Sequence, residues 1–194
     1  MAHYNSKDHY FHKAKKEGFV ARSAYKLQEI QQKYKIIRPG DRVLDLGCSP
    51  GSWSQVAAKI IGENGFLTGI DLKPVTISST KRTQFIVGDI LNLDLKEMGP
   101  FSVILSDMAP STSGIKSRDQ ALSEELCYTV LSIAKRRLDK GGNLVMKLFE
   151  GPESEQVAKQ TKDLFAKVQR YKPLAVRKGS YETYIIGTSF NFNY

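Results

Sequence analysis

Residues 43–53 read Val-Leu-Asp-Leu-Gly-Cys-Ser-Pro-Gly-Ser-Trp, and this stretch decides the fold of the chain. Its opening Val-Leu-Asp-Leu run is typical of a buried strand and ends at a turn that contains Gly47, Pro50 and Gly51. The pattern of a helix follows at residues 52–61. Strand, turn and helix together predict a βα unit that binds a nucleotide-like ligand, because glycines let the backbone approach a ligand and the first helical amides face it. The spacing differs from the three-glycine fingerprint of dinucleotide-binding folds.

Strand-like and helix-like segments alternate along most of the remaining chain. Strands are expected at residues 43–46, 66–70, 84–87, 101–105, 143–148, 173–176 and 182–189. Helices are expected at residues 21–34, 52–61, 119–138 and 153–168. Gly141-Gly142 is expected to separate the third helix from the strand after it. The alternation predicts an α/β, Rossmann-like fold with a mostly parallel seven-stranded sheet and helices on both faces.

Positive charge is concentrated near the N-terminus. We expect residues 1–194 to form a single domain, with a basic and flexible arm at residues 1–20. Residues 1–42 hold ten lysines and arginines against four acids, and therefore carry +6 of the formal net charge of +9. This concentration indicates a polyanionic partner, and RNA or DNA is favoured over a membrane because no large apolar face accompanies the charge. A solvated arm without a partner explains the charge equally well.

Composition excludes several other classes of protein. No apolar run approaches the length that spans a bilayer, and the first residues lack the apolar segment of a secretory signal. Cys48 and Cys127 have no metal-ligand spacing, so we expect free thiols in a reducing compartment and no metal site. These features predict a cytoplasmic protein without a membrane partner.

Charged residues stand where successive strands of the expected sheet end. They are Asp45, Asp71, Asp89, Asp107 and Lys147. The carboxyl ends of parallel strands meet at one edge of a sheet, and ligands of α/β proteins bind beyond that edge. The sequence therefore predicts that these side chains belong to one site.

The turn and its nearby carboxylates suit S-adenosylmethionine (SAM), which combines a ribose with a positive centre. The turn from Gly47 to Trp53 would cradle the methionine part, and Asp45 and Asp71 match the positive centre and the ribose. Asp89 is placed to meet the adenine amino group. Each residue alone is equally typical of an ordinary turn, cap or core position, and only the set favours a nucleotide.

Lys147 lies within the apolar run Asn-Leu-Val-Met-Lys-Leu-Phe of residues 143–149, where a lysine either reaches solvent or requires a partner. Asp107, Glu182 and Lys26 are candidate partners, because two lysines alternating with two carboxylates satisfy one another's charge. Such a cluster suits methyl transfer to a hydroxyl group. Lys147 would act either as a base or as a cation that orients the hydroxyl and stabilises its developing charge, and the sequence leaves both roles open.

Five ordered motifs resemble the FtsJ/RrmJ family of SAM-dependent RNA 2′-O-ribose methyltransferases. They read Ala-Arg-Ser-Ala-Tyr-Lys-Leu at 21–27, Leu-Asp-Leu-Gly-Cys-Ser-Pro-Gly-Ser-Trp-Ser-Gln at 44–55, Ser-Asp-Met-Ala-Pro at 106–110, Val-Met-Lys at 145–147 and Ser-Tyr-Glu at 180–182. The turn departs from the family pattern, which is richer in Gly and Ala, at Cys48, Ser49 and Ser52.

The resemblance implies a class I methyltransferase with a tetrad formed by Lys26, Asp107, Lys147 and Glu182, in which Lys147 is the central catalytic residue. It implies SAM contacts at Gly51, Trp53, Asp71, Asp89 and Asp107. The type member of the family modifies a uridine of large-subunit ribosomal RNA.

We therefore expect a monomeric, cytoplasmic enzyme that methylates a ribose 2′-hydroxyl of 23S rRNA within the ribosomal subunit, with no DNA partner. Three alternatives remain open. The first is the same reaction on a tRNA or an mRNA cap. The second is a non-catalytic RNA-binding or ribosome-assembly protein, and the third is a nucleotide-dependent oxidoreductase.

Overall fold

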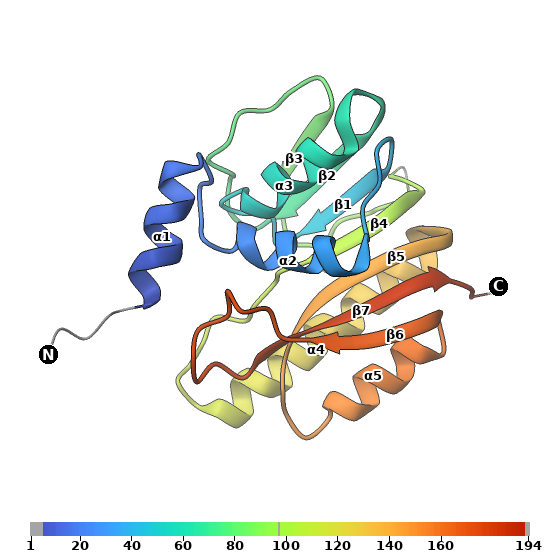
Figure 1. Cartoon of the computed structure of the whole chain (residues 1–194). Coiled ribbons are helices and arrows are strands. Elements are labelled where there is room, and N and C mark those ends of the chain that lie inside the picture. The colour runs from blue at the N-terminus through green and yellow to red at the C-terminus, as the bar shows by residue number, and fades with distance from the viewer. Residues whose placement is uncertain (1–5, 97, 193–194) are drawn as a thin grey trace, which may run out of the picture.

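Seven strands form one sheet in the computed structural model, which describes residues 6–96 and 98–192. The strands are β1 Arg42–Leu46, β2 Phe66–Asp71, β3 Thr83–Val87, β4 Phe101–Ser106, β5 Leu138–Phe149, β6 Phe165–Tyr171 and β7 Glu182–Phe190. The helices are α1 Ser6–Lys16, α2 Ala24–Tyr34, α3 Ser52–Ile61, α4 Lys116–Arg137 and α5 Ser154–Lys162, with a 3₁₀ turn at Gly62–Asn64. The strand order is β3-β2-β1-β4-β5-β7-β6 (Figure 1), which confirms the expected α/β class.

The parallel direction of most strands places their carboxyl ends together along one edge of the sheet. β1 pairs in parallel with β2 and β4, and the parallel pairing continues to β3 and β5. Of the seven strands in the described residues, β7 alone runs in the opposite direction: it lies between β5 and β6 and is antiparallel to both. The carboxyl ends of β1, β2, β4 and β5 therefore lie at the same edge as the beginning of β7, and β1 and β4 flank the point where the strand order reverses.

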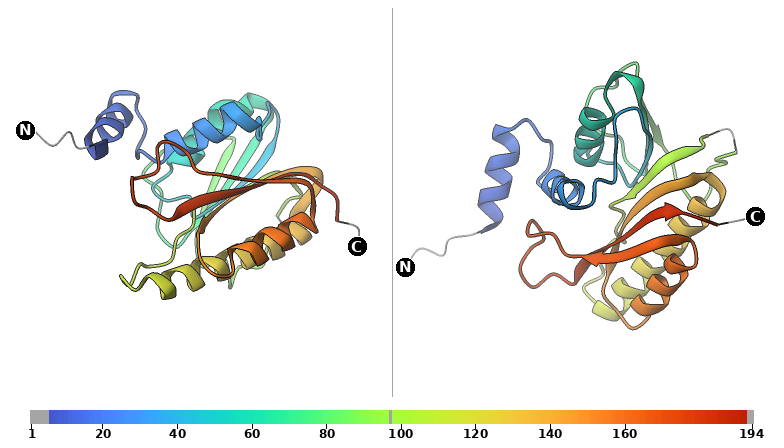
Figure 2. Two further views of the ribbon diagram at one scale, coloured as in Figure 1. Left: turned by 60° about the horizontal axis from the view of Figure 1, so that its bottom comes forward. Right: turned by 45° about the vertical axis from the view of Figure 1, so that its right-hand side comes forward.

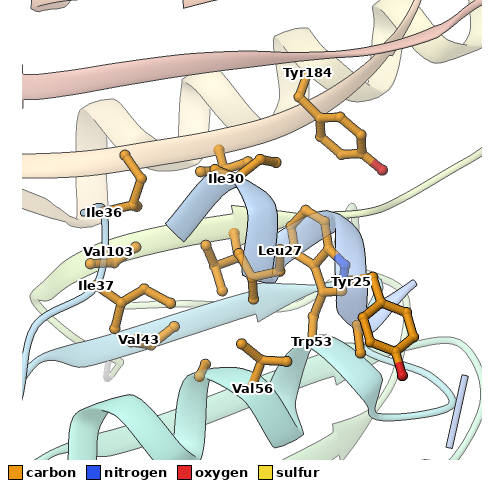
Figure 3. Close-up of a cluster of buried hydrophobic side chains, with 14 of the residues drawn as sticks. Tyr25, Leu27, Ile30, Ile36, Ile37, Val43, Trp53, Val56, Val103 and Tyr184 are labelled. Carbon is orange, nitrogen blue, oxygen red and sulfur yellow. The ribbon is translucent and has the colours of Figure 1, made fainter. Parts of the chain in front are cut away.

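Helices cover both faces of the sheet (Figures 1 and 2). Along β1 the side chains alternate, so Val43 joins the cluster under α2 and α3 and Leu44 joins the cluster under α4 and α5. Figure 3 shows the first cluster, in which Leu27 and Ile30 of α2 lie beside Trp53 of α3. The apolar stripe expected on the helix at residues 21–34 is the one that packs here.

The expected helix at residues 153–168 is wrong in its second half. Helix α5 ends at Lys162, and the chain re-enters the sheet as β6 from Phe165. Strand pairing decides this, because β6 forms a continuous antiparallel ladder with β7 and the Phe165 ring packs against Phe190 at 5.3 Å between centroids. Apolar spacing alone cannot separate a short buried strand from the end of a helix.

Two further boundaries also differ from expectation. Residues 173–176 form a turn rather than a strand, and the Glu29 carboxylate of α2 accepts hydrogen bonds from the amides of Leu174 and Ala175. Strand β5 begins at Leu138, directly after α4, so Gly141-Gly142 lies inside the strand instead of before it. The register of β5 against β4 shifts near these glycines, between Phe101 and Val103.

The basic N-terminal segment contains helix α1, where the sequence shows no clear period. The Tyr10 ring lies 5.4 Å from the Tyr25 ring, and Ala14 is buried against the body of the protein. Residues 1–5 of the expected flexible arm lie outside the described residues. None of the helices in the described ranges is long and apolar enough to cross a membrane.

Candidate active site

Four side chains that are distant in sequence meet at the edge where β4, β5 and β7 come together. Asp107 follows β4 directly, Lys147 lies near the carboxyl end of β5, and Glu182 is the first residue of β7. Lys26 reaches them from the first turn of α2. The antiparallel pairing of β7 with β5 sets Tyr184 opposite Lys147 and Glu182 opposite Phe149, which holds the strand residues in register.

The four groups form two ion pairs in which each ammonium contacts one carboxylate. Nζ of Lys26 lies 2.5 Å from Oε1 of Glu182, and Nζ of Lys147 lies 3.1 Å from Oδ1 of Asp107. Lys147 also donates to the backbone oxygen of Asp107 at 2.5 Å. The Lys147 side chain is only 8% exposed, so its ammonium is held by these acceptors instead of by bulk water.

Tyr184 connects the two pairs, and the sequence analysis did not find it. Its hydroxyl lies 2.8 Å from Oδ1 of Asp107 and 2.7 Å from Oε1 of Glu182. A phenol carries one hydrogen, so it can donate to only one of these oxygens at a time. A signal was present in the sequence: Tyr184 stands two residues after Glu182 on the same strand, and its side chain therefore points to the same face.

Electrostatics keeps Asp107 ionised. Burial acts to raise the pKa of Asp107, but the ammonium groups of Lys147 and Lys26 and the hydrogen bonds from Tyr184 and Lys147 lower the pKa below its ordinary value. For Tyr184, burial and the two neighbouring carboxylates raise the pKa well above its ordinary value, so the phenol is neutral. The cluster therefore presents two carboxylates, two ammonium groups and one neutral donor.

Strand β1 places a further carboxylate, which is fully buried, beside this cluster. Asp45 is fully buried, and its Oδ2 accepts a hydrogen bond from Ser54 of α3 at 2.6 Å. Its Oδ1 is buried without a hydrogen-bond partner among the described residues. Burial, together with the negative charges of Asp107 and Asp71, raises the pKa of Asp45 to about 7. An oxygen in this state matches a cationic group such as the ammonium of a methionine moiety.

Gly51 and Gly47 shape the turn in different ways. Gly51 has φ of 118° at the position before α3, and a Cβ there would lie 2.8 Å from Cγ1 of Ile77. Gly47 has φ of 75°, and a Cβ there would lie 2.6 Å from Cγ of Met108, in the loop after β4. Glycine at both positions allows the turn after β1 to lie close to neighbouring loops, which a side chain would prevent.

The carboxylates after β2 and β3 have backbone partners. Asp71 accepts hydrogen bonds from the amides of Ser49 and Lys73, both at 2.9 Å, and so ties the turn to the end of β2. Asp89 accepts from the amide of Leu91 at 3.0 Å and from the side chain of Asn92 at 3.1 Å. The pattern at Asp89 is an Asx-turn. Carboxylate oxygens hold additional acceptor sites, so contacts of both residues with a nucleoside stay a prediction.

Trp53 belongs to the core. Its side chain is buried, its ring lies 5.6 Å from the Tyr184 ring, and its Nε1 donates to the backbone oxygen of Ser23 at 2.9 Å (Figure 3). Trp53, near the start of α3, therefore packs against Tyr184, whose phenol belongs to the charged cluster. Its direct contact with SAM stays a prediction.

Comparison with known proteins identifies the family. The model of the FtsJ-like methyltransferase family matches residues 19–190 of this chain. The chain belongs to the FtsJ-like methyltransferase family. Ribosomal RNA large subunit methyltransferase E of Bdellovibrio bacteriovorus is 49% identical over 193 residues, which cover 96% of this chain and 98% of that protein. The corresponding protein of Syntrophobacter fumaroxidans is 49% identical over 95% of this chain and 96% of its own length.

Solved structures agree with the assignment to the FtsJ-like family. A Plasmodium falciparum protein assigned as a ribosomal RNA methyltransferase superposes with a TM-score of 0.78 at 29% identity, covering 89% of this chain and 98% of its own. An Aeropyrum pernix fibrillarin with bound S-adenosyl-L-methionine gives a TM-score of 0.61 at 15% identity, covering 86% and 73% of the two chains. This second likeness shows the class I fold alone.

Proposed function

We propose that this chain transfers the methyl group of SAM to a ribose 2′-hydroxyl of large-subunit ribosomal RNA, and that a uridine of 23S rRNA within the ribosomal subunit is the target. The relatives named for large-subunit methyltransferase E support the choice of RNA. The observation that carries the proposal is the charged cluster of Lys26, Asp107, Lys147 and Glu182 beside the glycine turn. We further propose that the enzyme acts in the cytoplasm as a monomer.

The residues of the turn would hold the methyl donor. Asp45 would offer its Oδ1 to the ammonium of the methionine part, Gly51 would leave room at the start of α3, and Asp71 would accept from the ribose hydroxyls. Asp89 would meet the adenine, and Asp107 would face the region between donor and acceptor. When bound, SAM supplies an electrophilic methyl carbon on a positively charged sulfur.

Lys147 would orient the ribose hydroxyl as a cation. Its Nζ makes two hydrogen bonds to Asp107, and an ammonium has three donors, which leaves one N–H for the 2′-oxygen. SAM would give its methyl group to the 2′-oxygen and leave as a neutral sulfide with the electron pair of the carbon–sulfur bond. The 2′-oxygen would lose its proton during the transfer, and the carboxylate of Asp107 would accept that proton. The fixed alignment of oxygen, carbon and sulfur would supply much of the rate.

Mapping the modified nucleotide tests this function directly. Purified protein is incubated with radiolabelled SAM and with large ribosomal subunits, naked 23S rRNA or naked tRNA, and the labelled nucleotide is identified by nuclease digestion and mass spectrometry. We expect a 2′-O-methyluridine in large-subunit RNA, and no label with Lys147→Met. Label in tRNA alone overturns the rRNA assignment, and label on a base overturns ribose chemistry.

RNA affinity tests the role of the basic N-terminal helix. Lys15 and Lys16 are exposed on α1, and reversal of both charges should weaken binding about tenfold and reduce the dependence of affinity on salt. Filter binding between about 50 and 200 mM salt measures both quantities. Reversal of Lys81, which is also exposed but lies in the β2–β3 connection, is the matched control. Unchanged salt dependence would remove α1 from the RNA-binding surface.

A further inference from the structure

An aromatic group adjoins the charged cluster at the start of β7. Tyr181 immediately precedes Glu182, and its ring meets the Phe149 ring edge to face at 4.9 Å between centroids. Nζ of Lys116, the first residue of α4, lies 5.7 Å from the centre of the Tyr181 ring. Phe149 follows Lys147 by two residues on β5. We call Phe149, Tyr181 and Lys116 the aromatic rim.

The aromatic rim is held in place by backbone contacts. The amide of Glu150 donates to the backbone oxygen of Tyr181 at 2.8 Å, which extends the pairing of β5 with β7. The loop before Tyr181 is anchored to α2 and to the turn before it: Glu29 of α2 accepts from the amide of Ala175 at 3.0 Å, and Arg22, before α2, donates to the backbone oxygen of Ala175 at 2.8 Å. Figure 1 shows this loop and the beginning of α4 at the same end of the sheet.

The two rings of the aromatic rim differ in exposure, and cations lie in the loop before one of them. Phe149 is buried, whereas Tyr181 is half-buried and retains accessible surface. The exposed cations Lys172, Arg177 and Lys178 lie in the loop that leads to Tyr181. A fixed, partly accessible aromatic ring with one cation beside it and further cations in the loop before it has the properties of surfaces that stack unpaired bases and hold their phosphates.

We propose that Tyr181 stacks a nucleobase of the RNA, either that of the methylated nucleotide or that of its direct neighbour, and so sets the ribose over Lys147. The proposal rests on the function proposed above. Tyr181 directly precedes Glu182 of the charged cluster, so a base stacked on the Tyr181 ring would lie next to that cluster. Lys116 would neutralise the phosphate beside that base. Tyr181 is thus a specificity residue for single-stranded or unstacked RNA.

The test separates stacking from a packing role with three variants of the full chain. Tyr181→Ala should raise the KM for large ribosomal subunits about tenfold with kcat within threefold, since one stacked base contributes about 1–3 kcal/mol. Tyr181→Phe should keep the parent KM. Tyr34→Ala is the matched control, because Tyr34 also meets another ring edge to face, that of Tyr171, and a lysine also lies over that pair.

A second readout uses a single-stranded RNA hexamer with a central 2-aminopurine, whose fluorescence is quenched by stacking. Quenching by the parent and by Tyr181→Phe, lost in Tyr181→Ala, supports the proposal. No quenching by the parent, or equal quenching and equal KM in Tyr181→Ala, overturns it. A loss of SAM affinity in Tyr181→Ala assigns the residue to packing and also overturns it. Absence of methylation by the parent defeats the proposed function, while the quenching still decides the role of Tyr181.

Discussion

Two carboxylates on the same face of the sheet, the buried Asp45 and the partly buried Asp107, have opposite electrostatic surroundings. Asp107 lies against Lys147 and Lys26, and its pKa is lowered although burial acts against this. Asp45 has Ser54 as its hydrogen-bond partner and the carboxylates of Asp107 and Asp71 as its charged neighbours. Burial, with these charges, raises the pKa of Asp45 to about 7.

The difference is that the protein itself supplies the counter-charges of Asp107, whereas Asp45 has no cationic partner among the described groups that shift its pKa. The charged cluster neutralises itself, so the groups proposed for catalysis are in position before any substrate binds. We propose that the charged cluster is preorganised, and that a cationic group of the bound cofactor, such as the methionine ammonium, supplies the missing counter-charge at Oδ1 of Asp45.

Removing the central cation should have the largest effect. Lys147→Met keeps the apolar stem but loses the ammonium, and kcat should fall by about 10³-fold because one preorganised charge contributes about that much to a transition state. SAM affinity measured by calorimetry should stay within about threefold, because Asp45 and the turn are unchanged. A kcat within tenfold of the parent would show that alignment alone carries the reaction.

Neutralising the other carboxylate should act on binding instead. Asp45→Asn should weaken SAM about 30-fold, since the ligand ammonium loses a buried charged partner. In the parent, affinity should rise from pH 6 to pH 8, because Asp45 must lose its proton to receive the cation and its pKa is about 7. Calorimetry at three pH values should show this rise in the parent and its absence in the variant. An equal rise in both proteins would contradict the assignment.

The same substitution should change stability in a pH-dependent way. The folded-state pKa of Asp45 lies above its unfolded value, so folding favours the protonated form, and that stability is lost as pH rises toward 7. Without cofactor, the free energy of unfolding of Asp45→Asn should therefore rise by about 2 kcal/mol relative to that of the parent as the pH goes from 5 to 8. Urea unfolding at both pH values measures the difference. A constant difference across this range would mean that Asp45 is already ionised.

The smallest effect is expected from the phenol that joins the two ion pairs. Tyr184→Phe removes one hydrogen-bond donor to Asp107 and Glu182 and should reduce kcat about fivefold, consistent with about 1 kcal/mol for one bond. The loss should be the same from pH 6 to pH 9, because the raised pKa of Tyr184 keeps the phenol neutral. Steady-state rates across this range provide the measurement. A loss as large as that of Lys147→Met would make Tyr184 a direct participant.

Local sequence patterns and the order of the motifs predicted much of the fold and the members of the charged cluster. The strand, turn and helix at residues 43–61 form as expected, since burial periodicity and glycine act over a few residues. The motifs named all four members of the charged cluster. Three of them, Asp107, Lys147 and Glu182, lie at or next to strand ends, which is where polar side chains of an α/β sheet gather. The second half of the helix expected at residues 153–168 is wrong because β6 exists only through its pairing with β7, which sequence spacing cannot reveal.

Only the tertiary structure decided how the charges are paired. The sequence placed two lysines and two carboxylates in one site, but the contact of Lys26 with Glu182 depends on the packing of α2 near the start of β7, and the contact of Lys147 with Asp107 depends on the register of β4 and β5. The link through Tyr184 and the unpartnered oxygen of Asp45 likewise arise from strand register and burial. Electrostatic energy depends on distances in space and on the removal of water, and both are set by packing between distant segments.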